Sequence, residues 1–84
     1  MVAVYVIESI KDHTWYTGIA LDPIKRLKDH NQGKNRFTKG HLSWKIIYTE
    51  IQPDWQSARK REKYLKSAAG KTWLKKYLNS INKP

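Results

Sequence analysis

An uninterrupted run of β-branched and aromatic side chains near the N-terminus, residues 3–7 (AVYVI), is the feature that most constrains the fold. Such a run is typical of a buried strand. A buried strand needs a neighbouring strand and a covering layer, yet a chain of 84 residues buries only roughly 60% of its unfolded surface. We therefore expect a single domain over residues 1–84, built around one small core.

Residues 14–20 (TWYTGIA) predict a second strand. Because only a short segment of turn-forming residues separates it from the first run, the two strands are expected to form an antiparallel hairpin. Its register decides whether Tyr5 and Tyr16 share a face: paired residue numbers with an odd sum place them together, and an even sum separates them. The sequence alone leaves both registers open.

Two helix-start signals follow the hairpin. Asp22 before Pro23 suits a helix N-terminus. The Asp side chain can accept hydrogen bonds from free backbone amides, and the first helical residue needs no backbone N–H, so Pro is tolerated there. Ile24 and Leu27 would anchor this helix, and residues 53–54 open a second one. In chain order we expect strands over residues 3–7, 14–20 and 44–49, helices over 23–31, 54–69 and 72–81, a loop over 33–43, and Gly70 just past the second helix. This order, ββαβαα, predicts the α/β (α+β) class with helices against a small, mainly antiparallel sheet.

The charge of the chain favours a polyanionic partner. Lys and Arg number 17 and Asp and Glu number 7, for a net charge of +10, which indicates nucleic acid or an anionic membrane surface. Four Trp and five Tyr argue against a disordered basic tail. The chain has no Cys, no signal-peptide pattern and no apolar run near the ~20 residues that span a bilayer. We therefore expect a cytoplasmic protein with no membrane role, associated with the nucleoid if bacterial.

Glu62 is the one acidic residue in an unexpected place. Steps of three and four residues put it on the same helical stripe as Ala58 and Leu65, among apolar side chains. An inward carboxylate on a basic helix needs a positive partner. One interpretation is an ion pair with Arg59 or Lys66. The other is a ligand for a hard cation, since Mg²⁺ sites beside phosphate use only one or two protein carboxylates.

Arg26 and His30 stand four residues apart, which predicts one lateral face of the first helix, away from Ile24 and Leu27. The Arg guanidinium is suited to phosphate. His30 would serve as a general acid or base, or simply as a cation near a helix C-terminus.

A basic surface is predicted around the loop and the second helix. Phe37 could stack on an exposed base, and six cations could bind phosphates: Lys34, Arg36, Lys39, Arg59, Lys60 and Lys63. The alternative is a solvated charged face. No base-reading set is evident, so we expect salt-sensitive binding that depends on DNA shape or backbone more than on sequence.

Several short motifs occur in a characteristic order: residues 4–6 (VYV), residues 15–18 (WYTG), Arg26, residues 30–31 (HN) and residues 61–62 (RE). In this order the chain resembles the GIY-YIG nuclease module over residues 2–71, and in particular its short, stand-alone branch, similar to the N-terminal domain of the excinuclease endonuclease subunit. The resemblance implies a three-stranded antiparallel sheet flanked by helices. It also implies Mg²⁺- or Mn²⁺-dependent cleavage of double-stranded or branched DNA, with a protein partner as a source of specificity. The alternative function is a nucleic-acid-binding module with little or no cleavage.

The resemblance implies a role for each motif residue. Glu62 matches the metal ligand of the family, and Arg26 matches its phosphate clamp. Tyr5 and Tyr16 match the tyrosines that activate or position water. Gly18 matches the motif glycine, where a side chain would crowd the site.

His30 matches a position that is His or Tyr in the family, and it could relay the proton of a tyrosine. A free Tyr has a pKa near ~10, so only about one in a thousand is ionised at neutral pH. A nearby Arg26 would lower that pKa. On this basis we expect cleavage to rise with pH above neutrality.

Overall fold

The central strand of the molecule is β1 (Val2–Ser9), which pairs with β2 (Trp15–Ala20) on one side and β3 (Trp44–Gln52) on the other. Both pairings are antiparallel. The computed structural model describes residues 1–81. The predicted fold class is confirmed: strands and helices follow in the order ββαβαα, apart from one additional short helix.

The register of the β1–β2 hairpin decides whether Tyr5 and Tyr16 share a face of the sheet. Ala3 pairs with Ala20, and Tyr5 pairs with Gly18. The paired numbers therefore have an odd sum, so Tyr5 and Tyr16 point to the same face. The register of β1 with β3 shifts by one residue between Val6 and Ile7.

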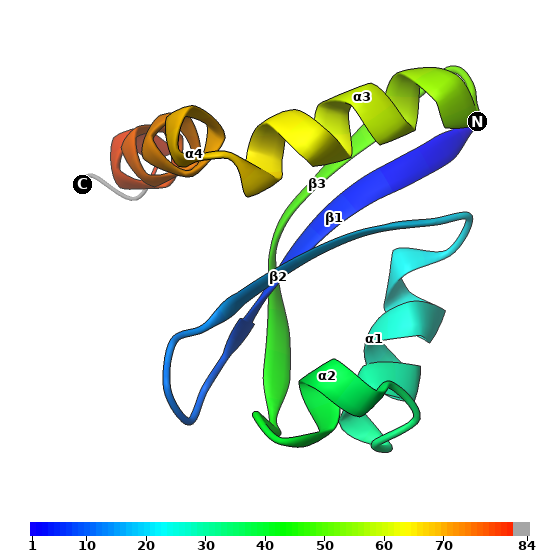
Figure 1. Cartoon of the computed structure of the whole chain (residues 1–84), viewed down its shortest axis with the longest axis vertical. Helices are drawn as coiled ribbons and strands as arrows, with labels where there is room; N and C mark the ends of the chain where they lie inside the picture. Colours follow the sequence, from blue (N-terminus) through cyan, green and yellow to red (C-terminus); the bar gives the residue numbers. More distant parts are fainter. Residues whose placement is uncertain (82–84) are drawn as a thin grey trace.

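The two faces of the sheet bury different sets of β1 side chains. Val2, Val4 and Val6 pack against α3 (Trp55–Lys66) and α4 (Ala68–Ile81). On the opposite face, a second cluster buries Tyr5 and Ile7 with Ala20 and Trp44, and Leu27 packs against it. Figure 1 shows α3 and α4 on one side of the sheet and the two shorter helices on the other. Because both faces are covered, β1 is apolar at nearly every position.

Helix α1 (Pro23–Asn31) begins as predicted, with the Asp22 side chain accepting the amide of Lys25 at 3.1 Å. Two expectations about its faces are wrong. Ile24 is exposed, whereas His30, placed on a lateral face by its spacing from Arg26, is the buried residue of the helix. Leu27 and His30, three residues apart, form the face that meets the sheet.

The segment predicted as a loop contains a short helix, α2 (Arg36–Lys39). The Asn35 side chain accepts the amides of Phe37 and Thr38 at 2.9 and 3.2 Å, which is the usual arrangement at a helix N-terminus. The Trp44 indole donates to the carbonyl of Thr38 at 2.9 Å and fixes α2 to the start of β3. The composition of residues 33–43 predicts a loop and gives no indication of this single helical turn.

Helix α3 ends at Lys66, with Ser67 as its C-cap, and not at the predicted residue 69. The Ser67 hydroxyl accepts the amide of Gly70 at 3.1 Å, so Ser67 caps the N-terminus of α4. Gly70 is buried at this junction, where a Cβ atom would collide with the backbone of Tyr64. Its role is therefore close packing between α3 and α4, and not the termination of a longer helix. Within residues 1–81, no helix is long and apolar enough to cross a membrane.

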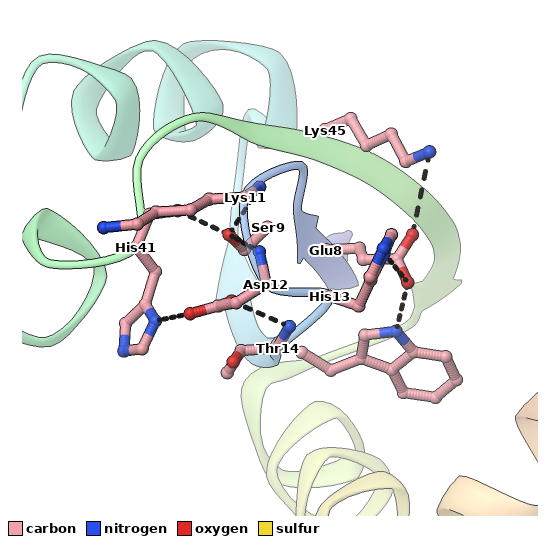
Figure 2. A network of polar contacts seen from close by, with 9 residues as sticks. Glu8, Ser9, Lys11, Asp12, His13, Thr14, His41 and Lys45 are labelled. Atoms are coloured by element: carbon pink, nitrogen blue, oxygen red, sulfur yellow. Dashed lines mark hydrogen bonds and ion pairs between the residues drawn. The ribbon is translucent and has the colours of Figure 1, made fainter.

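The turn between β1 and β2 is joined to the segment before β3 by side-chain contacts. The hydroxyl of Ser9 donates to the carbonyl of His41 at 2.6 Å and accepts the amides of Lys11 and Asp12. The Asp12 carboxylate pairs with Nδ1 of His41 at 2.6 Å (Figure 2). These contacts hold the end of the sheet that lies opposite the β1 N-terminus.

Candidate active site

A cleft of about 450 Å³ opens at the β2 edge of the sheet, where α1 reaches that edge from one face and α3 from the other. Four of the five residues predicted to be catalytic line it, and His30 lies behind Tyr5. The full lining is Tyr5, Tyr16, Gly18, Ile19, Arg26, Trp55, Arg59 and Glu62.

Tyr5 is the most deeply placed of the lining side chains and is only 1% exposed. Its Oη forms a hydrogen bond with Nε2 of His30 at 2.9 Å. Gly18 lies opposite Tyr5 on β2, and a Cβ atom there would be 2.5 Å from the Tyr5 Oη. The glycine therefore leaves the space that the phenol occupies.

The pKa values of Tyr5 and His30 shift so that both groups are neutral at neutral pH. Burial and the neighbouring Tyr16 raise the pKa of Tyr5 well above its ordinary value of 10.0, and the Arg26 guanidinium offsets only part of that rise. Arg26 does lower the pKa of Tyr5 as expected, but the loss of hydration dominates and the net shift is upward. Burial, followed by the positive charge of Arg26, lowers the pKa of His30 below 6.5.

Tyr16 lies between the buried pair and the surface. Its ring centroid is 6.5 Å from that of Tyr5 and 5.0 Å from that of His30, which it meets edge-on. Phe37 of α2 packs on the outer side of Tyr16, with 5.8 Å between the two ring centroids, and is 52% exposed. Tyr16 therefore presents a half-buried phenol to the cleft, with an exposed aromatic ring beside it.

Arg26 and Glu62 supply the opposite charges of the cleft from different helices. Arg26 is exposed on α1, while the Glu62 side chain is 24% exposed. Glu62 pairs with Lys66 at 3.2 Å on the same helix, as one interpretation of its spacing predicted. The Lys66 side chain is 55% exposed, and such a pair contributes only about 0.3–0.5 kcal/mol. The pairing therefore leaves Glu62 available to the cleft.

The carboxylate of Glu62 is the group in the cleft that could hold a divalent cation. Among residues 1–81, no three His, Cys, Asp or Glu side chains lie close enough to form a protein-only metal site. A single carboxylate with a phosphate and water as the other ligands is a donor set that Mg²⁺ accepts. The residues present fit a hard cation bound together with an anionic substrate.

The predicted nucleic-acid contacts are spread more widely than the catalytic candidates. Arg59 lines the cleft, and Lys34 lines a small recess beside Arg26 and His30, where it pairs with Asp29 at 3.4 Å. The other four predicted cations are exposed on α2 and α3 outside the cleft lining: Arg36, Lys39, Lys60 and Lys63.

Arg61, next to Glu62 in the sequence, has a structural role. Its Nε donates to both oxygens of Glu50 at 3.0 Å, and its guanidinium lies 4.7 Å from the ring centroid of Trp73. It therefore joins α3 to β3 and α4.

Sequence reasoning missed one buried polar residue at the site. The Oγ1 of Thr38 lies 2.8 Å from Nδ1 of His30, and Thr38 is fully buried. The only available signal was the sequence Asn35 to Thr38, in which Asn suits the start of a helix.

The chain is similar over most of its length to a group of small proteins. The family model for the GIY-YIG catalytic domain matches residues 1–78. A UPF0213 protein of Streptococcus agalactiae serotype V is 35% identical over 79 residues, or 89% of each chain. The UPF0213 protein YazA of Bacillus subtilis is 35% identical over 68 residues, which cover 80% of this chain and 68% of YazA. The solution NMR structure of the UPF0213 protein BH0048 from Bacillus halodurans is 32% identical and covers 92% of this chain and 85% of that one, with a TM-score of 0.56.

Proposed function

Because the chain belongs to the GIY-YIG catalytic-domain family, we propose that it is a metal-dependent endonuclease that hydrolyses DNA phosphodiester bonds. The observation that carries this proposal is the convergence of Tyr5, Tyr16, Arg26 and Glu62 on one cleft. These residues come from four different elements, so no single amphipathic pattern accounts for their meeting.

We propose that Glu62 holds Mg²⁺ or Mn²⁺ together with the scissile phosphate. When bound, the cation would act as a Lewis acid that stabilises negative charge on phosphate oxygens. Arg26, on the opposite side of the cleft, would bind non-bridging phosphate oxygens and stabilise the charge that develops on them. Gly18 leaves the space that the Tyr5 phenol occupies at the floor of the cleft.

The remaining task is to remove a proton from the attacking water. Tyr5 would accept that proton at its Oη while passing its own proton to Nε2 of His30, which it contacts at 2.9 Å. The water oxygen then forms the new bond to phosphorus, the bond to the leaving sugar oxygen breaks, and that oxygen takes a proton from solvent. Tyr16 would orient the water. This relay needs a neutral imidazole, which the lowered pKa of His30 supplies at neutral pH.

The pH dependence of cleavage should follow His30. The neutral form of His30 accepts the proton, so activity is lost as the pH falls through a pKa that lies below 6.5. We expect a rate that is flat from about pH 7 to about pH 9 and declines only in acid, because a hydrogen-bonded phenol does not need to ionise first. Initial rates of plasmid nicking at constant ionic strength measure this profile.

The profile also separates this relay from a phenolate mechanism. A rate that rises about tenfold per pH unit above neutrality would contradict the relay and assign the base to an ionised tyrosine, as expected from sequence alone. A wild-type rate in His30→Gln would likewise remove His30 from the reaction.

The DNA surface would surround the cleft on α2 and α3. Arg59 lines the cleft, and Phe37 adjoins Tyr16 at its outer side. We propose that this surface contacts phosphates of double-stranded or branched DNA with little sequence specificity, and that a protein partner supplies specificity where it is needed. Binding should then weaken steeply with salt, by a logarithmic slope of roughly −0.9 for each phosphate neutralised on duplex DNA.

The test of the proposed function uses the wild-type protein on supercoiled plasmid and on a branched synthetic duplex. We expect nicking in Mg²⁺ or Mn²⁺, and at least about a hundredfold less in EDTA, while gel-shift binding persists in both conditions. Salt-sensitive binding with no cleavage in any divalent metal would overturn the nuclease assignment in favour of a nucleic-acid-binding module.

A further inference from the structure

Three buried polar side chains form a continuous chain from the cleft to α2. Tyr5 Oη lies 2.9 Å from Nε2 of His30, and Nδ1 of His30 lies 2.8 Å from Oγ1 of Thr38. All three residues are at most 1% exposed. The Thr38 hydroxyl also donates to the carbonyl of Asn35 at 3.4 Å.

The directions of these hydrogen bonds follow from the hydrogens that must be satisfied. Among residues 1–81, the phenol of Tyr5 has Nε2 of His30 as its one hydrogen-bond partner, and its hydrogen goes there when the contact is made by Tyr5 as donor. A neutral imidazole with an accepting Nε2 carries its hydrogen on Nδ1 and donates it to Thr38. The hydroxyl hydrogen of Thr38 then goes to Asn35. Each buried hydrogen has an acceptor in this arrangement.

The opposite arrangement is less favourable. With the hydrogen on Nε2, His30 donates to Tyr5, whose own hydrogen then has no acceptor among residues 1–81 and must turn to water in the cleft, where it opposes acceptance of a proton from the attacking water. The Thr38 hydroxyl must then turn to Nδ1, and the Asn35 carbonyl loses its contact with it. The first arrangement keeps the Tyr5–His30, His30–Thr38 and Thr38–Asn35 contacts together within the protein, so it is preferred.

We propose that Thr38 is a positioning residue that holds His30 in the tautomer with hydrogen on Nδ1, and so keeps Nε2 free to receive the proton of Tyr5. The catalytic part of this inference rests on the proposed nuclease function, whereas the tautomer is a property of the folded protein alone. An acceptor on one ring nitrogen that sets the role of the other is a recurrent arrangement in catalytic histidines.

The placement of Thr38 suits this role because its backbone is held from two directions. Asn35 caps its amide at 3.2 Å, and the indole of Trp44 donates to its carbonyl at 2.9 Å. Asn31, next to His30, accepts the amide of Trp44 at 2.7 Å and donates to its carbonyl at 3.1 Å. Both partners of the His30–Thr38 contact are therefore fixed to the start of β3.

The test is Thr38→Val, which keeps the branched shape but removes the hydroxyl. Long-range proton–nitrogen correlation spectra of ¹⁵N-labelled protein report which ring nitrogen of His30 is protonated. We expect hydrogen on Nδ1 in the wild type and a shift toward Nε2 in Thr38→Val. Cleavage should fall about a hundredfold through kcat, with little change in KM, because His30 no longer accepts the proton. Thr38→Ser, which restores the hydroxyl, should recover the wild-type spectrum and rate.

Ser9→Ala is the matched control. It also removes a fully buried hydroxyl with hydrogen bonds to a carbonyl and to backbone amides, but at the β1–β2 turn (Figure 2). We expect the His30 spectrum and the rate of this variant to match the wild type at a temperature where it is folded.

Two spectral results would overturn the proposal. Hydrogen on Nε2 in the wild type contradicts it even if Thr38→Val does not fold. Unchanged protonation of Nδ1 in a folded Thr38→Val variant contradicts it as well. If the wild type cleaves no DNA, the proposed function fails, while the spectra still decide the role of Thr38.

Discussion

Replacing Glu62 with glutamine is expected to lower the rate of plasmid nicking by at least about a hundredfold. Glutamine keeps the length of the side chain and its place on α3 but removes the charge that would hold the divalent cation in the cleft. DNA binding should persist or strengthen slightly, because the change removes one negative charge from a basic surface. Parallel nicking and gel-shift titrations measure the two effects, and a metal titration should show a higher Mg²⁺ requirement.

Two control variants isolate the position of the charge. Glu8→Gln removes a carboxylate that pairs with Lys45 at 3.7 Å and accepts from the indole of Trp15, outside the cleft lining. Lys66→Gln removes the ion-pair partner of Glu62 and leaves its carboxylate in place. Both should nick plasmid at rates near that of the wild type. A folded Glu62→Gln variant that cleaves within about threefold of the wild type would exclude Glu62 as the metal ligand.

The central strand β1 could be predicted from local pattern because its burial on both faces makes the pattern unambiguous. The apolar run of residues 3–7 lies inside β1, and the two neighbouring strands also lie near their predicted positions. The register could not be predicted, because it depends on how the turn at residues 9–14 is built. Ser9 and Asp12 settle it through contacts with each other and with His41, which is distant in the sequence.

The sequence predicts which residues meet at the candidate site, but not which of them are buried. Spacing correctly indicated that Glu62 does not simply face solvent, and the family motif indicated Tyr5 and Tyr16. Spacing placed His30 on the wrong face of α1, because a helical repeat does not reveal which side packs on the sheet. A buried histidine requires a partner for each ring nitrogen, and one of the two, Thr38, lay in a segment without strong periodicity.

The break between α3 and α4 is a second place where local sequence pattern does not reveal a tertiary contact. A glycine after a helical pattern usually marks a C-terminus, and the sequence predicts that role for Gly70. In the structure, Ser67 ends one helix and caps the next, while Gly70 allows the two helices to approach. Only the three-dimensional contact with Tyr64 distinguishes a terminating glycine from a packing glycine.

Gly18→Ala is expected to damage both stability and activity. The new Cβ atom would lie 2.5 Å from Oη and 2.6 Å from Cζ of Tyr5. The Tyr5 ring is buried and hydrogen-bonded to His30, so it cannot move aside without losing packing and that contact. Overpacking of this kind costs about 1–3 kcal/mol of unfolding free energy. Displacement of the phenol by about 1 Å should lower cleavage about a hundredfold.

Gly40→Ala is the matched control, since a Cβ atom at Gly40 meets no atom within 4 Å and the residue has ordinary right-handed helical dihedral angles. Denaturant unfolding and initial nicking rates measure both variants under the same conditions. Gly40→Ala should match the wild type within about 0.5 kcal/mol. If Gly18→Ala also matches it in stability and rate, the tight contact between Tyr5 and Gly18 does not fix the phenol. If stability falls while the rate in the folded fraction is unchanged, Gly18 serves packing alone, and the position of the Tyr5 hydroxyl does not limit the reaction.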